Sequence, residues 1–294
     1  MPIEKELKNI KKDVLLAPFT TFKIGGRAKY FFVAHSQQQI IEALEQAQKY
    51  HLPFFILGGG SNLLVSDKGF DGLVIKIQNS KIERKDSSII AEAGANLAQL
   101  LTIAKNSGLS GLEWAAGIPG TVGGALRGNS GAFGKSIADL VRNVRVFDIS
   151  TRTIKNYSTK DCLFGYRESI FKKNKELVIL SGEFVFDRDS IYEIEKRMKR
   201  YLEYRKAKQP LECFSAGCIF KNPEGFSAGK LIEKCSLKGK RKGGAQISKK
   251  HGNFIINLGN ATSQDVMFLI TLAKEEVKRK FGIELEEEIE FLGF

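Results

Sequence analysis

The sequence predicts an α+β fold from two observations. Several well-separated segments show apolar residues at helical spacing, and short apolar runs typical of strands lie among them. The order of these helices and strands along the chain is that of an α+β fold. We therefore expect an α+β chain with a larger N-terminal unit, to about residue 190, and a smaller C-terminal one.

The N-terminal half begins with a helix after Ser36. Ser36 and Gln39 have the spacing of a capping box, and an apolar stripe follows them at helical spacing. Asn96 is expected to cap a second helix, which ends just before Gly108. The expected strands of this half lie at residues 54–57, 73–77, 88–94, 141–149 and 177–187.

The C-terminal half is expected to open with a long helix after Ser190, and a charged segment with Pro210, residues 205–217, is a plausible boundary. Residues 263–281 have helical periodicity, and Gly282 is the expected stop. The tail from residue 283 alternates apolar and charged residues as a strand does. Further expected elements are a short helix at 228–235 and strands at 245–248 and 253–258.

Composition narrows the class of protein. The 294 residues are 43% hydrophobic, and no run of apolar residues approaches the length of a membrane span. Residues 1–19 lack the apolar core of a signal peptide, so we expect a cytoplasmic protein without membrane insertion. The four cysteines and three histidines have no spacing typical of zinc ligands, so we expect no metal site.

The net charge of +13 has three interpretations. Basic residues gather in residues 238–250, where they are typical of phosphate contacts to nucleic acid, of attraction for small polyanionic ligands, or of a solvated loop. The sequence has no recognisable nucleic-acid-binding motif, so we expect no nucleic-acid partner.

Two glycine-rich tracts resemble nucleotide-binding motifs without matching them. Residues 128–136, GNSGAFGKS, lack the first glycine of a P-loop because Asn129 occupies that position. Gly58 and Gly60 fit a dinucleotide fingerprint, but Leu63 stands at its third glycine. A strand that runs into residues 58–62 still exposes successive N–H groups, which suit a pyrophosphate, although a tight β-turn explains the same residues equally well. Residues 111–134 have the same character, and we refer to residues 58–62 and 111–134 as the two glycine tracts.

Six motifs occur in one order along the chain. They are GGGSNLL (58–64), GLEWAAGIPGTVGGA (111–125), FGYRESIF (164–171), SAGCIFKNP (215–223), GGAQISKKHGNFIIN (243–257) and LEEEIEFLG (285–293). Together they resemble the UDP-N-acetylenolpyruvoylglucosamine reductase (MurB) family of bacterial peptidoglycan synthesis, from residue 20 to the end. The tyrosine-bearing insertion of longer members is absent, so the chain resembles the shorter type.

The resemblance implies a two-lobed FAD-binding fold of the vanillyl-alcohol-oxidase (PCMH) type with a C-terminal α+β substrate-binding domain. The implied divisions are an N-terminal segment 1–19, an FAD-binding domain 20–187 with lobes 20–79 and 80–187, and a C-terminal domain 188–294. It also implies non-covalent FAD, NADPH as co-substrate, and roles in cell-wall biogenesis, cell shape and cell division. We expect a monomer. The implied cofactor residues are Gly58, Gly59, Gly60, Ser61, Asn62, Gly117, Thr121, Gly123 and Gly124.

The implied reaction reduces an enolpyruvyl ether, with hydride from the flavin N5 to C3 and a proton to C2. It needs a cation for the substrate carboxylate, a polar group for the developing charge and a proton donor. By resemblance these are Arg167, Glu288 and Cys218. Taken alone, Arg167 is typical of a surface ion pair. Alternation puts four tail glutamates on one face of the last strand, so Glu286 is the second choice for the catalytic glutamate.

Cys218 is a departure from the family, which usually has serine at this position. A thiol is a stronger acid than an alcohol and can donate the proton while it is neutral, whereas a thiolate has none to give. The alternative is a drifted, inactive site. By weaker resemblance, substrate contacts are Lys206, Lys221, Asn222 and Gln246.

Two other functions fit part of the sequence. A flavin-dependent sugar or lactone oxidase of the same fold would share the glycine tracts, but it has no need for Arg167, Cys218 and Glu288 together. A nucleic-acid-binding protein would use the basic segment at residues 238–250.

Overall fold

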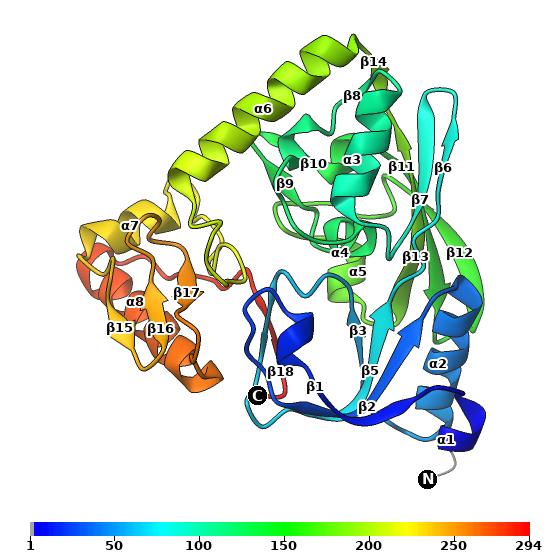
Figure 1. Ribbon diagram of the computed structural model, residues 1–294, viewed down its shortest axis with the longest axis horizontal. Coiled ribbons are helices and arrows are strands. Elements are labelled where there is room, and N and C mark those ends of the chain that lie inside the picture. The colour runs from blue at the N-terminus through cyan, green and yellow to red at the C-terminus, as the bar shows by residue number, and fades with distance from the viewer. Residues whose placement is uncertain (1–2) are drawn as a thin grey trace. The chain divides into compact units, whose positions relative to one another are not determined.

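The computed structural model describes residues 3–294, whose helices and strands fall into two compact units (Figure 1). The first unit comprises the residues up to Lys11, Phe31–Gly59 and Leu73–Tyr204, and the second comprises Lys12–Tyr30, Gly60–Gly72 and Arg205–Phe294. Each unit is thus assembled from separate stretches of sequence. The mixture of helices and strands confirms the predicted α+β class, and the predicted domain boundaries stay a prediction.

The first unit contains a five-stranded antiparallel sheet in the order β12-β11-β13-β7-β6. Its central strand is almost entirely buried, and Gly182 in that strand leaves room for a helix, because a Cβ there would lie 2.8 Å from Leu126 Cδ1. The strands are β6 (Ile82–Lys85), β7 (Ser88–Glu92), β11 (Val141–Asp148), β12 (Thr153–Ser158) and β13 (Leu177–Val185).

Helices and short strands complete the first unit. The helices are α1 (Ile3–Glu6), α2 (Gln37–Lys49), α3 (Leu97–Asn106), α4 (Val122–Arg127), α5 (Ile170–Lys173) and α6 (Ile191–Lys208), the last of which ends in the second unit. Short 3₁₀ turns are Glu113–Ala115 and Ile137–Asp139. The strands are β3 (Phe54–Leu57), β8 (Leu109–Ser110), β9 (Gly131–Ala132), β10 (Lys135–Ser136) and β14 (Asp187–Arg188).

The cap of α2 forms only in part as predicted. The Ser36 side chain accepts a hydrogen bond from the Gln39 N–H at 3.2 Å. The Gln39 side chain, however, accepts from the His35 N–H at 2.8 Å instead of the Ser36 N–H. The Asn96 cap of α3 is a complete capping box, so that prediction is confirmed.

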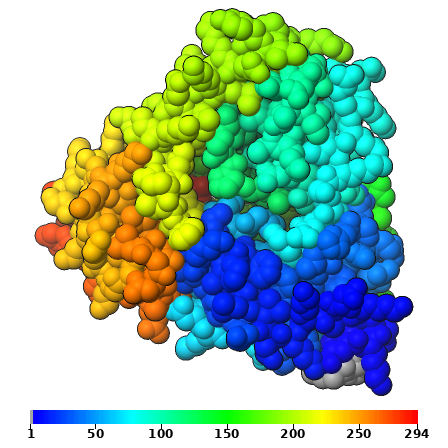
Figure 2. Space-filling view, viewed as in Figure 1, coloured from blue at the N-terminus to red at the C-terminus, as the bar shows by residue number. Residues whose placement is uncertain are grey.

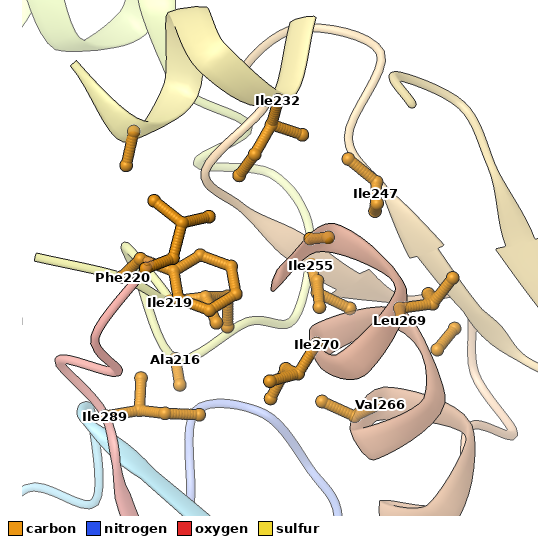
Figure 3. Packing of buried hydrophobic residues seen from close by; sticks show 14 of the residues in the cluster. Ala216, Ile219, Phe220, Ile232, Ile247, Ile255, Val266, Leu269, Ile270 and Ile289 are labelled. Carbon is orange, nitrogen blue, oxygen red and sulfur yellow. The ribbon is translucent and has the colours of Figure 1, made fainter. Parts of the chain in front are cut away.

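The second unit packs two helices against a small antiparallel sheet. The helices are α7 (Ala228–Lys234) and α8 (Ser263–Phe281), and the sheet has the order β15-β16-β17. Figure 3 shows their apolar side chains meeting in one core, to which Ile219, Phe220 and Ile289 also contribute. Gly282 adopts a φ of 68° and ends α8 as predicted. The strands are β15 (Arg241–Lys242), β16 (Ala245–Ile247) and β17 (Ile255–Asn257).

The tail differs from its prediction. Alternation predicted one strand from residue 283, but only β18 (Glu290–Leu292) is a strand, parallel to β4 (Leu63–Val65). Glu287 adds an isolated bridge to Phe220. Leu285 and Ile289 are each buried in the core as separate anchors, which gives the alternation without continuous pairing.

A further sheet contains β3 and has the order β1-β2-β5-β3, in which β1, β2 and β5 each include residues of both units. Among residues 3–294, we find no helix with an apolar stretch long enough to span a bilayer. The additional elements are β1 (Lys11–Leu15), β2 (Arg27–Ala34), β5 (Phe70–Ile77) and the 3₁₀ turn Ala17–Phe19.

Candidate active site

The two glycine tracts meet in the first unit. A Cβ built on Gly58 would lie 2.7 Å from Thr121 Oγ1, and one on Gly59 would lie 2.8 Å from Gly120 Cα. Such contacts leave no room for a side chain, so close packing of one tract on the other requires both glycines. Lys76 Nζ donates to the Gly58 carbonyl, and burial lowers the pKa of Lys76. No motif in the sequence indicated that Lys76 lies at this position.

The second tract contains helix α4, which sequence periodicity did not predict. Thr121 caps it by accepting from the Gly124 N–H at 3.3 Å. A Cβ on Gly123 would lie 2.9 Å from Ala93 Cβ, so packing requires glycine there too. Gly124 differs, because a Cβ there would meet only Thr121 Oγ1, at an ordinary 3.5 Å. Gly117 has a φ of 80°, which favours glycine.

The end of the first tract, Gly60–Asn62, belongs to the second unit and is tied to the tail. Gly60 has a φ of 64°, and a Cβ on it would lie 2.2 Å from the Phe19 carbonyl oxygen. Asn62 Nδ2 donates to the Glu288 carbonyl at 3.1 Å, and the Glu290 N–H donates to the Asn62 carbonyl at 2.9 Å. The tract is therefore held in place by the segment that carries the predicted catalytic glutamate.

Cys218 lies in an extended segment held from two sides. The Ile219 N–H donates to the Asn253 carbonyl at 2.9 Å, and the Glu288 N–H donates to the Ile219 carbonyl at 2.7 Å. Cys218 also forms a β-bridge with Phe254. The thiol is reduced and half-buried, and Gly217 before it has a φ of 80°. The structure thus brings Cys218 and Glu288 onto neighbouring extended segments.

The two candidate tail glutamates have different surroundings. Glu288 is half-buried, next to the Cys218 segment. Glu286 has a side chain that is 71% exposed, and it pairs with Lys221 Nζ at 2.5 Å. These placements favour Glu288 over Glu286 as the residue with a chemical role.

Asn253 is a residue of this site that the sequence did not single out. Its side chain is buried and makes two hydrogen bonds to one backbone residue. Oδ1 accepts from the Phe220 N–H at 2.9 Å, and Nδ2 donates to the Phe220 carbonyl at 2.8 Å. Asn253 therefore acts as a neighbouring strand would and holds the segment that begins at Cys218. Its place in the motif at residues 243–257 was the only signal that could have found it.

Arg167 lies in the first unit, at a tight turn. Its φ is 58°, and Gly165 and Glu168 form a bridge around it. Its Nη1 donates to the Gly131 carbonyl at 3.0 Å, and Lys172 Nζ donates to the Arg167 carbonyl at 3.1 Å. The half-buried guanidinium is therefore oriented by backbone on the β9–β10 hairpin.

The predicted substrate residues all lie in the second unit. Lys206 is exposed, and its carbonyl accepts from Lys250 Nζ at 2.6 Å. Asn222 Oδ1 accepts from the Ala228 N–H at 3.0 Å. Gln246 is buried and donates from Nε2 to the Gly239 carbonyl at 2.9 Å. Asn222 and Gln246 therefore have bonds that shape their own loops, and the substrate contacts stay predictions.

Metal-binding clusters were sought over the same residues, 3–294. No group of three or more histidine, cysteine, aspartate or glutamate side chains is arranged there to hold a metal ion.

Comparison with known proteins gives consistent matches along the chain. The family model described as the C-terminal domain of UDP-N-acetylenolpyruvoylglucosamine reductase matches residues 209–292, and one described as an FAD binding domain matches residues 28–156. The reductase of Caldanaerobacter subterraneus subsp. tengcongensis is 44% identical over 93% of this chain and 90% of its own. That of Caldicellulosiruptor bescii is 44% identical over 100% of this chain and 95% of its own.

A solved structure agrees with these matches. The crystal structure of UDP-N-acetylenolpyruvylglucosamine reductase (MurB) from Thermus caldophilus has a TM-score of 0.83 and 35% identity, and it covers 97% of this chain and 99% of its own. The residues of the glycine tracts fit the FAD that such a domain binds. Their glycines have no side chains that would keep a ligand away from the backbone N–H groups. A Cβ on Gly124 would meet only Thr121 Oγ1, at an ordinary 3.5 Å, so a ligand can approach there.

We expect Asn253→Ala to lower the free energy of unfolding by about 2–4 kcal/mol. The change leaves the buried N–H and carbonyl of Phe220 without these partners, and each unsatisfied group costs about 1–3 kcal/mol. Urea denaturation measures the loss. Asn106→Ala, at an exposed position at the end of α3, is the matched control and should change stability by less than about 0.5 kcal/mol. Equal stability of the two variants would contradict the role given to Asn253.

Proposed function

The chain belongs to the UDP-N-acetylenolpyruvoylglucosamine reductase family, and on this basis we propose that it reduces UDP-N-acetylglucosamine enolpyruvate to UDP-N-acetylmuramate with NADPH. The full-length relatives support the substrate, and the FAD-binding-domain match supports the cofactor. The relatives named above are reductases, which argues against the oxidase and the nucleic-acid-binding protein. The reaction serves peptidoglycan synthesis, so we expect roles in cell-wall biogenesis, cell shape and division, and a cytoplasmic monomer.

FAD, held without a covalent bond, would supply hydride transfer from NADPH to C3 of the enolpyruvyl group. Gly58–Asn62 are proposed to hold its pyrophosphate through backbone N–H groups, and Gly117, Thr121, Gly123 and Gly124 to lie along the dinucleotide. The contact of Gly58 and Gly59 with the second tract supports this assignment, because it makes one backbone surface from both tracts.

Arg167 is proposed to bind the carboxylate of the enolpyruvyl group. As C3 receives hydride, negative charge builds on C2 and on that carboxylate, and a forked guanidinium can donate two parallel hydrogen bonds to it. Glu288, in its protonated form, is proposed to donate a hydrogen bond to the same developing charge. Preorganised donors of this kind lower the barrier because they do not reorient during the step.

Cys218 is proposed to give its proton to C2. The S–H bond breaks, a C–H bond forms at C2, and the thiolate regains a proton from solvent before the next turnover. Only the neutral thiol can donate, so a positive environment that favoured the thiolate would oppose the reaction. Lys206, Lys221, Asn222 and Gln246 remain the proposed contacts to the sugar and phosphates.

The observation that carries the assignment is the hydrogen bond from the Glu288 N–H to the Ile219 carbonyl. It places the proposed charge-stabilising residue directly across from the residue after Cys218, within one unit. Cys218 and Glu288 are 70 positions apart in the sequence, and this bond brings the two segments that carry them side by side.

Substitution of Cys218 should separate the two halves of the reaction. In Cys218→Ala, we expect NADPH to reduce the flavin at the normal rate. The reduced flavin should transfer hydride to the enolpyruvyl substrate at least about 100-fold more slowly, since a positioned proton donor raises the rate by about 10²–10⁴-fold. Cys218→Ser should retain substantial activity. Anaerobic stopped-flow absorbance follows both half-reactions.

Cys235→Ala is the control for this experiment, because Cys235 is also a half-buried, reduced thiol in the second unit. It should behave as the unsubstituted protein does. Normal flavin reoxidation in Cys218→Ala would remove Cys218 from the mechanism.

Gly124→Ala tests the cofactor surface. The position is helical and has room for a methyl group, so the apoprotein should be as stable or up to about 1 kcal/mol more stable. A dinucleotide that lies against Gly124 would meet that methyl group, and the affinity for FAD should fall at least tenfold. Gly128→Ala, one turn later with a single 3.5 Å neighbour, is the matched control. Unchanged FAD affinity in Gly124→Ala would show that the cofactor lies elsewhere.

A further inference from the structure

The β9–β10 hairpin of the first unit has an unusual turn. Ala132 pairs with Lys135, so Phe133 and Gly134 form a two-residue loop, and their φ angles are 56° and 75°. Positive φ at both positions is what a type I′ turn requires, and Asn-Gly is the preferred pair. A bulky aromatic residue in the left-handed region is a genuine outlier, and such strain persists only where the surroundings stabilise it.

The ring of Phe133 packs on helix α6. It stacks on Tyr201 with centroids 4.5 Å apart and an interplanar angle of 28°, and it meets Tyr204 edge-on at 5.3 Å. Tyr201 and Tyr204 are three positions apart on α6 and therefore present one surface. Helix α6 lies at the molecular surface (Figure 2, light green), and Phe133 and Tyr204 stay 41% and 54% exposed. Because both side chains stay this exposed, the burial of apolar surface alone does not explain why the three rings pack together.

The hairpin also holds Arg167. Gly131, two residues before Phe133, accepts the hydrogen bond from Arg167 Nη1 at 3.0 Å. Gly131 pairs with Ser136, and a Cβ on it would lie 2.4 Å from the Lys135 carbonyl oxygen. The two strands are thus in close contact, and a shift of the turn moves the carbonyl that orients the guanidinium.

A second contact joins the same segments. Asn129 Nδ2 donates to the Gly165 carbonyl at 2.8 Å, and Asn129 Oδ1 accepts from the Ala138 N–H at 3.3 Å. Asn129 fixes the base of the hairpin to the Arg167 turn, whereas the Phe133 ring fixes its tip to α6. The hairpin is therefore anchored at both ends, with the Gly131 carbonyl between the anchors.

We propose that Phe133 is a positioning residue for Arg167. By stacking on Tyr201 and Tyr204 it holds the Gly131 carbonyl where Arg167 Nη1 needs it, so that the guanidinium is oriented before the substrate carboxylate arrives. This inference rests on the proposed function, because it assumes that Arg167 binds that carboxylate. A misplacement of about 1 Å at such a group can cost about 10²-fold in rate.

The test uses Phe133→Asn in the FAD-loaded protein. The substitution creates the preferred Asn-Gly turn, so it removes the ring without unfavourable backbone conformation. We expect flavin reoxidation by the enolpyruvyl substrate to slow by about 10- to 100-fold, and flavin reduction by NADPH to stay within about twofold. Phe133→Tyr, which keeps the ring, should restore the rate. Tyr192→Ala, a 72% exposed tyrosine on the same helix, is the matched control and should have no effect.

A double-mutant cycle separates positioning from general damage. If Phe133 acts only through Arg167, Phe133→Asn should slow reoxidation in the original protein but add no loss in an Arg167→Ala background. An equal loss in both backgrounds would overturn the proposal, as would a normal rate in Phe133→Asn alone. Normal activity of Arg167→Ala would instead contradict the proposed function, and with it this inference.

Should Phe133→Asn fail to fold, Tyr204→Ala serves in its place. It removes the edge-on contact from outside the hairpin. A smaller loss confined to reoxidation, absent in the Arg167→Ala background, would support the proposal, and no loss would overturn it.

Discussion

The arrangement of the second unit depends on one hydrogen bond, from the Glu288 N–H to the Ile219 carbonyl at 2.7 Å. It holds the tail against the Cys218 segment, and the Asn62 amide then holds the Glu288 carbonyl at 3.1 Å. Three motifs that are far apart in the sequence thereby share one network of hydrogen bonds. Ile219 and Ile289 are both buried in the core of Figure 3, so packing of the unit stabilises this register.

The chain uses backbone and side chains for different tasks. The glycine tracts offer N–H groups and close packing, which suit a large anionic cofactor of fixed shape. The proposed chemistry falls to three side chains, and each has a hydrogen bond at or beside its own residue. Arg167 Nη1 donates to the Gly131 carbonyl, Ile219 is bonded beside Cys218, and the Glu288 carbonyl accepts from Asn62 Nδ2. Rigid support of this kind keeps catalytic groups oriented without the substrate.

Local patterns in the sequence predicted the elements that depend on local physics. The Asn96 cap, the final helix and its Gly282 stop are confirmed, and the motifs identified the family. Helix α4 was missed because six residues are too few to show periodicity. The prediction of one continuous strand for the tail was wrong, because separate buried anchors produce the same alternation of apolar and charged residues as strand pairing does. Asn253 and Phe133 act through contacts with residues distant in sequence, which no local pattern reports.

We propose that the neutral thiol of Cys218 donates the proton to C2. The most direct test is the pH dependence of flavin reoxidation by the enolpyruvyl substrate, measured by anaerobic stopped flow in the original protein and in Cys218→Ser. As the pH rises through the pKa of a thiol, the neutral donor is lost, so the rate in the original protein should fall at alkaline pH. Serine does not titrate there, and the fall should disappear in Cys218→Ser. The same alkaline fall in both proteins, or in neither, would show that the Cys218 thiol is not the proton donor.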